Sequence, residues 1–305
     1  MIKIGVIGLS VHSAAYTEII NSGASDPEFN DCRVVAIFHP EGNPDVEFSE
    51  KQLQSFTDTI KGQGVEFTGS LKELVRKVDA VMLLTNDGRP HLKEIMPILK
   101  AGKPVYVDKP LAATLQDVLA IFKVSGKYNV PMFSCSPLRF VKEALDIREG
   151  KIVGKVLGAN TYGPAPLQKS HADLFWDGIH AVESLYTVLG GAGCKTVTRT
   201  FTDDADVVTG NWTDGRIGVF RGIRKGKSGF GGTAFGDKGI ASIGGFGGYR
   251  PLVVAIAEFF RSRKSPVSDE ETIEIYAFME AADESKRLGG IPVDLSEILM
   301  RAKKK

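Results

Sequence analysis

The sequence predicts an α/β protein in which a doubly wound parallel sheet is followed by an α+β domain built on an antiparallel sheet. Up to about residue 135, short and uniformly apolar segments alternate with helical segments, which is typical of parallel strands buried on both faces. Beyond residue 136 the pattern changes to strand-like segments joined by turns. The 305 residues suit two domains, which we expect to span residues 1–135 and 136–305.

Five apolar segments are expected to form the sheet of the first domain: Lys3–Gly8, Arg33–Phe38, Ala80–Thr85, Pro104–Asp108 and Val130–Cys135. Five helical segments alternate with them: Ser13–Ser22, Ser49–Lys61, Leu71–Val78, His91–Ala101 and Thr114–Tyr128. Because buried strands that alternate with helices pair in parallel, this order predicts the doubly wound sheet.

The second domain begins with a helical segment at Leu138–Glu149 and ends with two more at Pro251–Arg263 and Asp269–Leu288. Four strands are expected between them: Lys155–Tyr162, Thr196–Thr202, Asp206–Trp212 and Gly215–Arg221. The last two are separated by Thr213-Asp214-Gly215, which predicts a hairpin. The glycine-rich segment Gly226–Gly248 is expected to form tight turns of the sheet or a close contact in a dimer. It is not a P-loop, because Arg221 stands where that motif needs glycine.

Composition argues against several classes of partner. The net charge is +1, so no overall field attracts nucleic acid or an anionic membrane. The three cysteines are far apart and form no C-x-x-C motif, which suits free thiols in a reducing compartment. The N-terminus runs directly into the first predicted strand without a signal-peptide pattern, and no apolar run approaches the length of a membrane span. We therefore expect a cytoplasmic protein.

The turn after the first strand carries part of the Rossmann fingerprint for dinucleotides, G-x-G-x-x-G. The aligned residues are Gly8-Leu9-Ser10-Val11-His12-Ser13, so only the first glycine is present. Gly8 suits the tight turn, the hydroxyl of Ser10 suits a phosphate, and the following helix N-terminus adds N–H groups. We expect Gly8, Leu9, Ser10, His12 and Ser13 to bind the cofactor, and the alternative is an ordinary first turn of a doubly wound protein.

The end of the second strand bears on the choice of cofactor. His39 stands where such domains usually have an acidic residue for the adenosine ribose. This histidine would pair with a 2′-phosphate, stack on adenine or do neither, and Glu41 is close enough to bind a ribose. The choice between NAD and NADP therefore stays open.

The segment Lys103–Ala112 contains Asp108-Lys109-Pro110 and resembles the Glu-Lys-Pro segment of the Gfo/Idh/MocA oxidoreductases. That family is named for glucose–fructose oxidoreductase, inositol dehydrogenase and a rhizopine-catabolism protein. The resemblance continues downstream in Arg139-Phe140 and in Phe175-Trp176-Asp177-Gly178-Ile179-His180. Later landmarks are Gly236-Asp237-Lys238-Gly239 and Ala281-Ala282-Asp283-Glu284-Ser285.

The resemblance implies a Rossmann domain followed by a domain with an open antiparallel sheet. It also implies NAD(P)-dependent oxidation or reduction of a sugar, polyol or related hydroxyl group. Thr85, Asn86 and His91 match a loop that passes near the nicotinamide, and Lys109 and Pro110 match residues beside the cofactor. A homodimer or homotetramer formed through the C-terminal sheet is expected by the same analogy.

Hydride transfer from an alcohol needs a base for the hydroxyl proton and a group that polarises the oxygen. Lys109 and His180 are of the right types, and Lys109 ends a strand on the carboxyl side of the predicted sheet, where ligands bind. In the family an aspartate usually lies four residues before the histidine, but here Trp176 holds that position and Asp177 lies three before. Since both offsets face the histidine on a helix, Asp177 is expected to orient His180 or to act only as a helix N-terminal carboxylate.

Four further residues are candidates for the substrate pocket: Arg139, Tyr162, His171 and Trp176. Arg139 would alternatively pair with a carboxylate, and Tyr162 and Trp176 would alternatively serve only packing. The spacing of His171, Asp173, Asp177 and His180 fits no metal motif, and metal binding is a minor option.

The expected partner is thus a small sugar or polyol, and the expected activity is that of an NAD(P)-dependent oxidoreductase. Two other functions stay open. Some relatives cleave glycosidic bonds through transient oxidation by bound NAD, and the same residues would serve that reaction. A non-catalytic dinucleotide or sugar sensor is the third hypothesis, because the glycine fingerprint is incomplete.

Overall fold

A computed structural model describes residues 1–23 and 25–304, and the chain divides into two compact units. Unit 1 consists of Met1–Ala112, Ala120–Cys135 and Tyr249–Ser268, and unit 2 consists of Ala113–Leu119, Ser136–Gly248 and Asp269–Lys305. Among the described helices, none combines the length and apolar composition needed to cross a bilayer.

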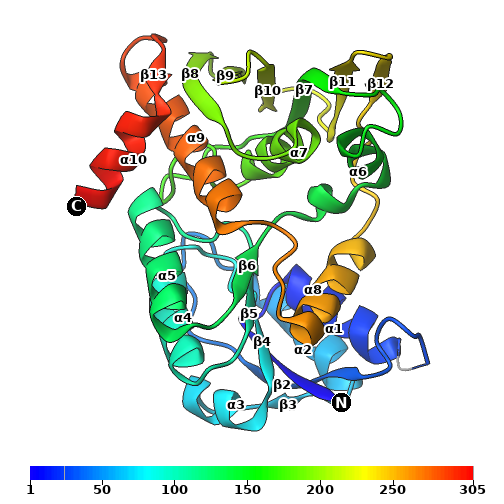
Figure 1. The fold of residues 1–305 in the computed structure, drawn as a ribbon. Helices are drawn as coiled ribbons and strands as arrows, with labels where there is room; N and C mark the ends of the chain where they lie inside the picture. Colours follow the sequence, from blue (N-terminus) through cyan, green and yellow to red (C-terminus); the bar gives the residue numbers. More distant parts are fainter. Residues whose placement is uncertain (24, 305) are drawn as a thin grey trace. The chain divides into compact units, whose positions relative to one another are not determined.

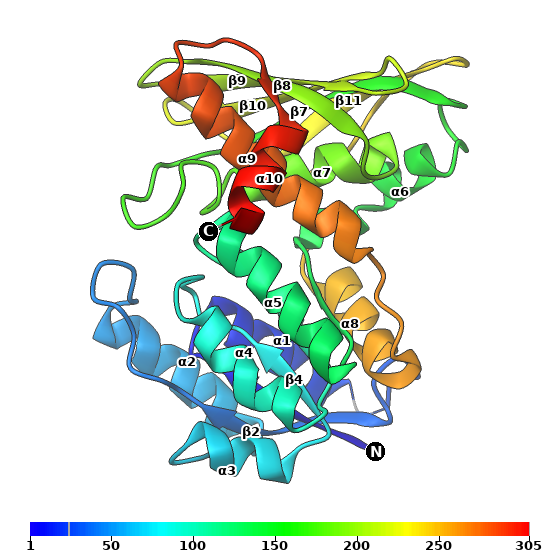
Figure 2. The same ribbon diagram turned by 60° about the vertical axis from the view of Figure 1, so that its left-hand side comes forward.

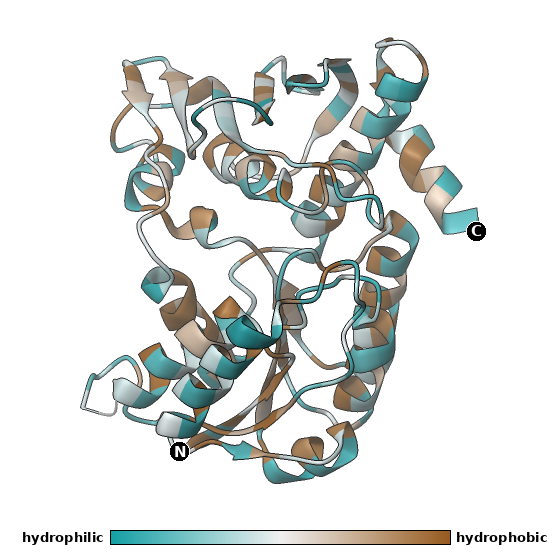
Figure 3. Cartoon of the chain, turned by 180° about the vertical axis from the view of Figure 1, so that it is seen from behind, coloured by the Kyte–Doolittle hydropathy of each residue, from teal (hydrophilic) through white to brown (hydrophobic). Residues whose placement is uncertain are grey.

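Unit 1 is built on a six-stranded sheet with the order β3-β2-β1-β4-β5-β6 (Figure 1). Its strands are β1 (Ile2–Ile7), β2 (Cys32–Phe38), β3 (Glu66–Phe67), β4 (Ala80–Leu83), β5 (Val105–Val107) and β6 (Met132–Ser134). All neighbouring strands pair in parallel. Every residue of β4, β5 and β6 is buried, and apart from Ser134 these residues are apolar or aromatic. Figure 3 shows hydrophobic strands at the centre of this sheet. The order reverses between β1 and β4, which is where ligands bind in open parallel sheets.

The helices connecting these strands are α1 (Val11–Ser22), α2 (Glu50–Gly62), α3 (Leu71–Lys77), α4 (His91–Lys100) and α5 (Leu115–Tyr128). Serine caps begin several of them: the Ser49 side chain and Gln52 form a capping box at α2, and the Ser70 hydroxyl accepts from the Glu73 amide at α3. The unit is completed by α8 (Arg250–Ser262), which packs against α1.

Unit 2 is built on a seven-stranded sheet with the order β12-β11-β7-β10-β9-β8-β13. Its strands are β7 (Val156–Pro164), β8 (Cys194–Phe201), β9 (Ala205–Trp212), β10 (Ile217–Ile223), β11 (Gly231–Gly236), β12 (Ile240–Ser242) and β13 (Val293–Asp294). Neighbouring strands run antiparallel except for β7 and β10, which pair in parallel. The sheet is therefore mixed.

Helices of unit 2 cover one face of this sheet, as Figure 2 shows for α7 and α9. The unit contains the 3-10 turn Pro137–Phe140, α6 (Lys142–Arg148), α7 (Ile179–Leu189), α9 (Asp269–Arg287) and α10 (Leu295–Lys304). All residues of α7 are buried, because this helix lies between the sheet and its neighbouring helices.

The predicted fold class is confirmed, and the expected hairpin at Thr213–Gly215 joins β9 to β10. The second sheet departs from the expected antiparallel pattern at one place, because β7 and β10 pair in parallel. Part of the glycine-rich segment Gly226–Gly248, expected to form tight turns of the sheet or a close contact in a dimer, forms β11 and β12. The division of the chain also differs from a single cut after residue 135, since Tyr249–Ser268 belongs to unit 1 and Ala113–Leu119 to unit 2.

Candidate functional site

The turn between β1 and α1 is closed against the neighbouring strand β4. Gly8 has a φ of +93°, a conformation that other residues rarely adopt. A Cβ atom at this position would lie 2.4 Å from the backbone nitrogen of Thr85, so only glycine fits. Because β1 and β4 are neighbours in the sheet, this contact between Gly8 and Thr85 lies at the point where the strand order reverses.

The two serines of the turn cap the start of α1. The Ser10 hydroxyl accepts from the Ser13 amide at 3.2 Å and donates to the Leu84 carbonyl at 3.1 Å. The Ser13 hydroxyl in turn accepts from the Ser10 amide at 3.1 Å. This capping box turns the Ser10 hydroxyl toward the protein interior, away from the phosphate role expected for it. Since the first turn of a helix leaves its N–H groups without intrahelical partners, the amides of Val11 and His12 remain suited to an anion.

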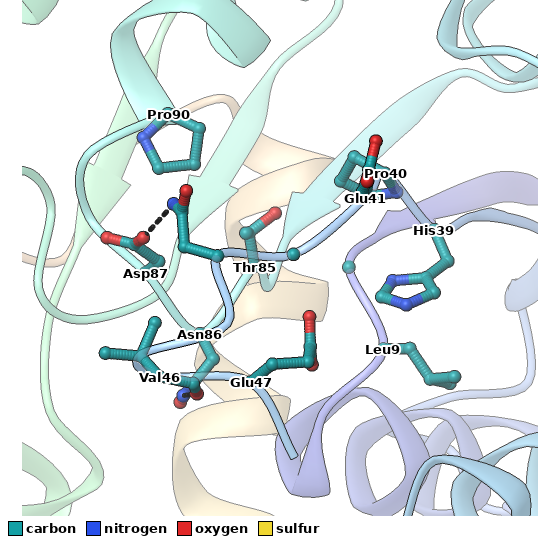
Figure 4. A pocket seen from close by; sticks show the side chains of 13 residues that line it. Leu9, His39, Pro40, Glu41, Val46, Glu47, Thr85, Asn86, Asp87 and Pro90 are labelled. Carbon is teal, nitrogen blue, oxygen red and sulfur yellow. Dashed lines mark hydrogen bonds between the residues drawn. The ribbon is translucent and has the colours of Figure 1, made fainter. Parts of the chain in front are cut away.

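A pocket of about 140 Å³ lies past the carboxyl ends of β1, β2 and β4 (Figure 4). It is lined by Gly8, Leu9, His39, Pro40, Glu41, Gly42, Asn43, Val46, Glu47, Thr85, Asn86, Asp87 and Pro90. Five residues predicted to bind the cofactor are thereby brought together: Gly8, Leu9, His39, Thr85 and Asn86. The other predicted cofactor residues do not line this pocket: Ser10, His12, Ser13, His91, Lys109 and Pro110.

The loop after β2 is tied to the loop after β4. The Arg89 Nη2 atom lies 2.7 Å from Asp45 Oδ1, and Arg89 Nε lies 3.0 and 2.8 Å from the two carboxylate oxygens of Asp87. The Asn86 side chain donates to the carbonyl of Val46 at 3.1 Å. These bonds hold the two loops as the walls of one pocket.

His39 presents an unsatisfied ring nitrogen inside this pocket. Its Nδ1 atom is buried and has no hydrogen-bond partner among the described residues. Burial lowers the pKa of the ring, and the nearby Glu47 carboxylate opposes this shift. A buried polar atom without a partner is costly in a folded protein, so the nitrogen fits a hydrogen bond from a bound ligand.

His91 has a structural position. It is completely buried, with Nδ1 lying 3.1 Å from the Leu111 carbonyl and Nε2 lying 3.0 Å from the Thr85 carbonyl. The ring thus braces the loop after β4 against the segment that follows Lys109 and Pro110, whose shared peptide bond is cis.

Asp108, which replaces the glutamate of the Glu-Lys-Pro segment, is paired with the first turn of α1. Its Oδ2 atom lies 2.6 Å from His12 Nδ1, and its Oδ1 atom accepts from the Tyr106 hydroxyl at 3.2 Å. Burial opposes ionisation, but the His12 charge and hydrogen bond outweigh it and lower the pKa of Asp108. His12 therefore links the phosphate turn to the strand end that carries Lys109.

In unit 2, His180 lies in the first turn of α7 and is oriented by a serine. Its Nδ1 atom is 2.7 Å from the hydroxyl of Ser136, and the Phe230 ring packs edge-on at 5.5 Å. The backbone amide of Ser136 donates to Glu183 at 2.7 Å, one turn along α7. The backbone of Asp177 accepts from the His180 amide, and the orienting role of its side chain stays a prediction.

Arg139 is buried between two carboxylates. Its Nε atom lies 2.7 Å from Glu183 Oε1, and its Nη2 atom lies 2.7 Å from Glu271 Oε1. Only 2% of the residue is exposed. Of the two alternatives, the contacts favour pairing with carboxylates over contact with a substrate.

The loop carrying His171, Trp176 and Asp177 is anchored by an ion cluster. Asp173 lies 3.0 Å from Arg199 Nη2 and 2.6 Å from Lys286 Nζ, and its amide donates to Asp283. The rings of His171 and Trp176 pack together with centroids 5.0 Å apart. Asp173, one of the two aspartates considered as metal ligands, is thus paired with cations. The described residues contain no group of three side chains that could hold a metal ion.

Tyr162 lies on a different face of unit 2 from His180. The hydroxyl of its neighbour Thr161 donates to the Ala181 carbonyl of α7. Because successive strand residues point to opposite faces, Tyr162 points away from α7 and is 42% exposed. The structure therefore does not bring Tyr162 together with His180.

The sequence reasoning did not single out Ser136, Glu47 or Asp87. The available signal for Ser136 and Asp87 was their place in the loops after β6 and β4, two and four residues past the strand ends, because the ends of parallel strands meet at the same edge of a sheet. Glu47 lies nine residues beyond the end of β2, and no local pattern connects it to the pocket.

Comparison with known families identifies the first part of the chain. Residues 2–134 match the family GFO_IDH_MocA, described as an oxidoreductase family with an NAD-binding Rossmann fold. No curated protein sequence matches the chain.

Solved structures share the fold over nearly the full length. A protein from Thermotoga maritima described as a probable dehydrogenase is 21% identical, with 97% of this chain and 99% of that chain covered and a TM-score of 0.78. The scyllo-inositol dehydrogenase of Lactobacillus casei, solved with NAD(H) and scyllo-inositol, is 15% identical, with coverages of 97% and 99% and a TM-score of 0.74. An oxidoreductase from Agrobacterium radiobacter, solved with NAD+, L-tartaric acid and magnesium, is 14% identical, with coverages of 97% and 99% and a TM-score of 0.74.

The residues of unit 1 fit a dinucleotide. The glycine turn gives close backbone approach, the His39 nitrogen lacks a partner, and carboxylates at the pocket suit ribose hydroxyls. The cofactor is NAD or NADP. Residues 2–134 thus match the Gfo/Idh/MocA oxidoreductases, a family with an NAD-binding Rossmann fold.

Proposed function

We propose that the protein is an NAD(P)-dependent dehydrogenase that transfers hydride between the nicotinamide and a CH–OH group of a polyol-like or carbohydrate-like substrate. The observation that carries this proposal is the Rossmann pocket together with Lys109 at the carboxyl end of β5 in the same unit. A solved structure of similar fold, a scyllo-inositol dehydrogenase, holds NAD(H) and a polyol.

The chain's residues divide the chemistry as follows. The bound cofactor supplies the hydride acceptor. Lys109 polarises the substrate oxygen, and the His12–Asp108 pair fixes the backbone beside it. His180 takes the hydroxyl proton, and we assign that proton to Nε2 because Nδ1 is engaged by Ser136. Loss of a proton and a hydride together converts the alcohol to a carbonyl.

Replacement of Lys109 tests this assignment. Lys109→Met should lower kcat by about 10²–10⁴-fold, the usual contribution of a positioned acid or base, measured as NADH formation from a panel of inositols and sugar alcohols. Lys100→Met, at an exposed position of α4, is the matched control and should keep wild-type turnover. Fluorescence titration with NADH should show that both variants still bind cofactor. Near-normal turnover in Lys109→Met would contradict the proposal.

A sensor that binds the cofactor without turnover is the second candidate. It is favoured by the Ser10–Ser13 capping box, which removes two amides from contact with a phosphate. Cofactor binding without turnover on any polyol, in both oxidation and reduction directions, would support the sensor over the dehydrogenase.

A further inference from the structure

The pocket of unit 1 is surrounded by carboxylates. Glu41 and Glu47 line it directly from the loop after β2, and Asp87 lines it from the loop after β4. Asp45 lies beside them in the first of these loops. No lysine or arginine is present among the lining residues that the structure describes.

The nearest guanidinium is already neutralised. Arg89 is bound by Asp45 through Nη2 and by both carboxylate oxygens of Asp87 through Nε. These hydrogen bonds raise the pKa of Arg89, which keeps the group charged, and they engage its Nε and Nη2 donors with carboxylates. With four carboxylates and one cation, the walls carry a net negative charge.

His39 adds no positive charge to balance them. Burial lowers the pKa of its ring below the ordinary value for histidine, so the imidazole is neutral at neutral pH. At the end of β2, where a basic residue would receive a 2′-phosphate, the structure therefore offers a neutral ring.

Glu47 is placed by the local backbone. Its Oε1 atom accepts from the Phe48 amide at 3.0 Å, and its Oε2 atom lies over Gly42, where a Cβ atom would be only 1.3 Å away. Gly42 thus leaves the space that the carboxylate occupies. Figure 4 shows the Glu47 side chain beside the ring of His39, between the loops after β2 and β4.

We propose that this pocket selects NAD over NADP, with Glu47 and Glu41 accepting hydrogen bonds from the hydroxyls of the adenosine ribose. The pocket lies on the β2 side of the strand-order reversal, where the adenosine half of a dinucleotide sits in such sheets. A 2′-phosphate there would face the carboxylates of Glu41, Glu47 and Asp87, and no lysine or arginine is among the described residues that line the pocket, so the extra phosphate is disfavoured. The inference rests on the proposed function, in that it requires a dinucleotide to bind this unit.

Binding of the reduced cofactors to the full chain tests the proposal. Fluorescence titration should give a Kd for NADH at least about tenfold lower than that for NADPH, because the carboxylates repel the extra phosphate. Glu47→Gln should narrow this ratio by weakening NADH and strengthening NADPH, and a Glu41→Gln/Glu47→Lys variant should narrow it further. Glu50→Gln, an exposed charge at the start of α2, is the matched control and should leave the ratio unchanged.

Each outcome bears on a different conclusion. Equal affinity for NADH and NADPH, or an unchanged ratio in Glu47→Gln, overturns the selection proposed here while leaving the dehydrogenase intact. Binding of neither cofactor by the wild-type chain instead overturns the proposed function. Thermal unfolding of each variant confirms that a lost affinity does not reflect a lost fold.

Discussion

At the scale of single residues, unit 2 contains a buried charge cluster around the guanidinium of Arg139. Arg139 pairs with two carboxylates, Glu183 and Glu271, and all three side chains are buried. Burial raises the pKa of Glu183, and Arg139 opposes that shift. Because Glu183 also accepts from the Ser136 amide, the same cluster holds the serine that orients His180.

Arg139→Met should therefore destabilise the protein strongly. Removing the cation takes the closest positive charge from two buried carboxylates, of which Glu271 still has the longer pair with Arg148 at 3.7 Å, and breaking a buried ion pair costs about 3–5 kcal/mol. Urea unfolding followed by circular dichroism measures the loss. Arg301→Met, which breaks an exposed pair with Glu284, should cost less than about 1 kcal/mol. Equal losses in the two variants would contradict the role given to Arg139.

At the scale of elements, the loop that carries His171, Trp176 and Asp177 depends on α9 and β8 for its position. Asp283 of α9 accepts from the Asp173 amide of that loop and lies 2.5 Å from Arg199 of β8. Burial, and secondarily the negative charge of Asp173, raise the pKa of Asp283 to about 7. The anchor of the loop thus includes a carboxyl group that holds a proton below neutral pH.

This titration predicts a pH-dependent stability. The unfolded carboxyl has a pKa of about 3.9, so the folded state binds the extra proton between about pH 4 and pH 7. The stabilisation from that proton is fully present below about pH 4 and is lost as the pH rises through about 7. Asp283→Asn should therefore flatten the fall of Tm between pH 5 and pH 8.

Glu284→Gln is the control for this measurement. Hydrogen bonds from Arg287 and Arg301 lower the pKa of Glu284 to about 2, so this group stays ionised across the whole range. Its replacement should shift Tm without changing the slope against pH. If Tm of Asp283→Asn fell with pH as steeply as Tm of the wild type, the pH dependence would come from groups other than Asp283.

The sequence predicted the apolar strands and helices better than the glycine-rich or highly charged ones. The strands of unit 1 were recognisable because apolar residues fill them on both faces, as in β4. The short strands β11 and β12 were missed because glycines dominate their segment and give no alternating pattern. The helix α10 was missed because its charged composition hides a narrow apolar side formed by Leu295, Ile298 and Ala302.

The site residues also fall into two groups: those that the local sequence marks and those that depend on distant contacts. Gly8, which lines the pocket, and Lys109, whose role stays a prediction, were both singled out because each follows a strand that the sequence marks. Ser136 and Glu47 act through contacts with residues far along the chain or outside any strand, which no local periodicity encodes.

At the scale of the whole molecule, assembly through the outer face of the second sheet stays a prediction. Unit 1 includes a segment from late in the chain, Tyr249–Ser268, which contains α8. The Phe259 ring of α8 packs edge-on against Phe133 of β6 at 4.8 Å, and Arg261 binds Asp31 at 2.6 Å. Tyr249 packs against His12, the partner of Asp108.

A fragment of residues 1–135 should consequently fail to fold cooperatively. It lacks α8, so Phe133 and the aromatic face of α1 would be exposed. A second fragment, in which a Gly/Ser linker joins residue 135 to residues 249–268, should recover a sigmoidal urea transition by near-ultraviolet circular dichroism. Cooperative unfolding of the first fragment alone would show that α8 is dispensable.

The same arrangement constrains the order of events during synthesis. The ribosome completes the parallel sheet early, but α8 emerges only after all of residues 136–248 have been translated. At about 5–20 residues per second, the nascent sheet waits for several seconds with its α8-binding surface uncovered. Folding of unit 1 on the ribosome is therefore delayed: the unit that starts first keeps an uncovered surface until Tyr249–Ser268 has emerged, after most of unit 2 has been translated.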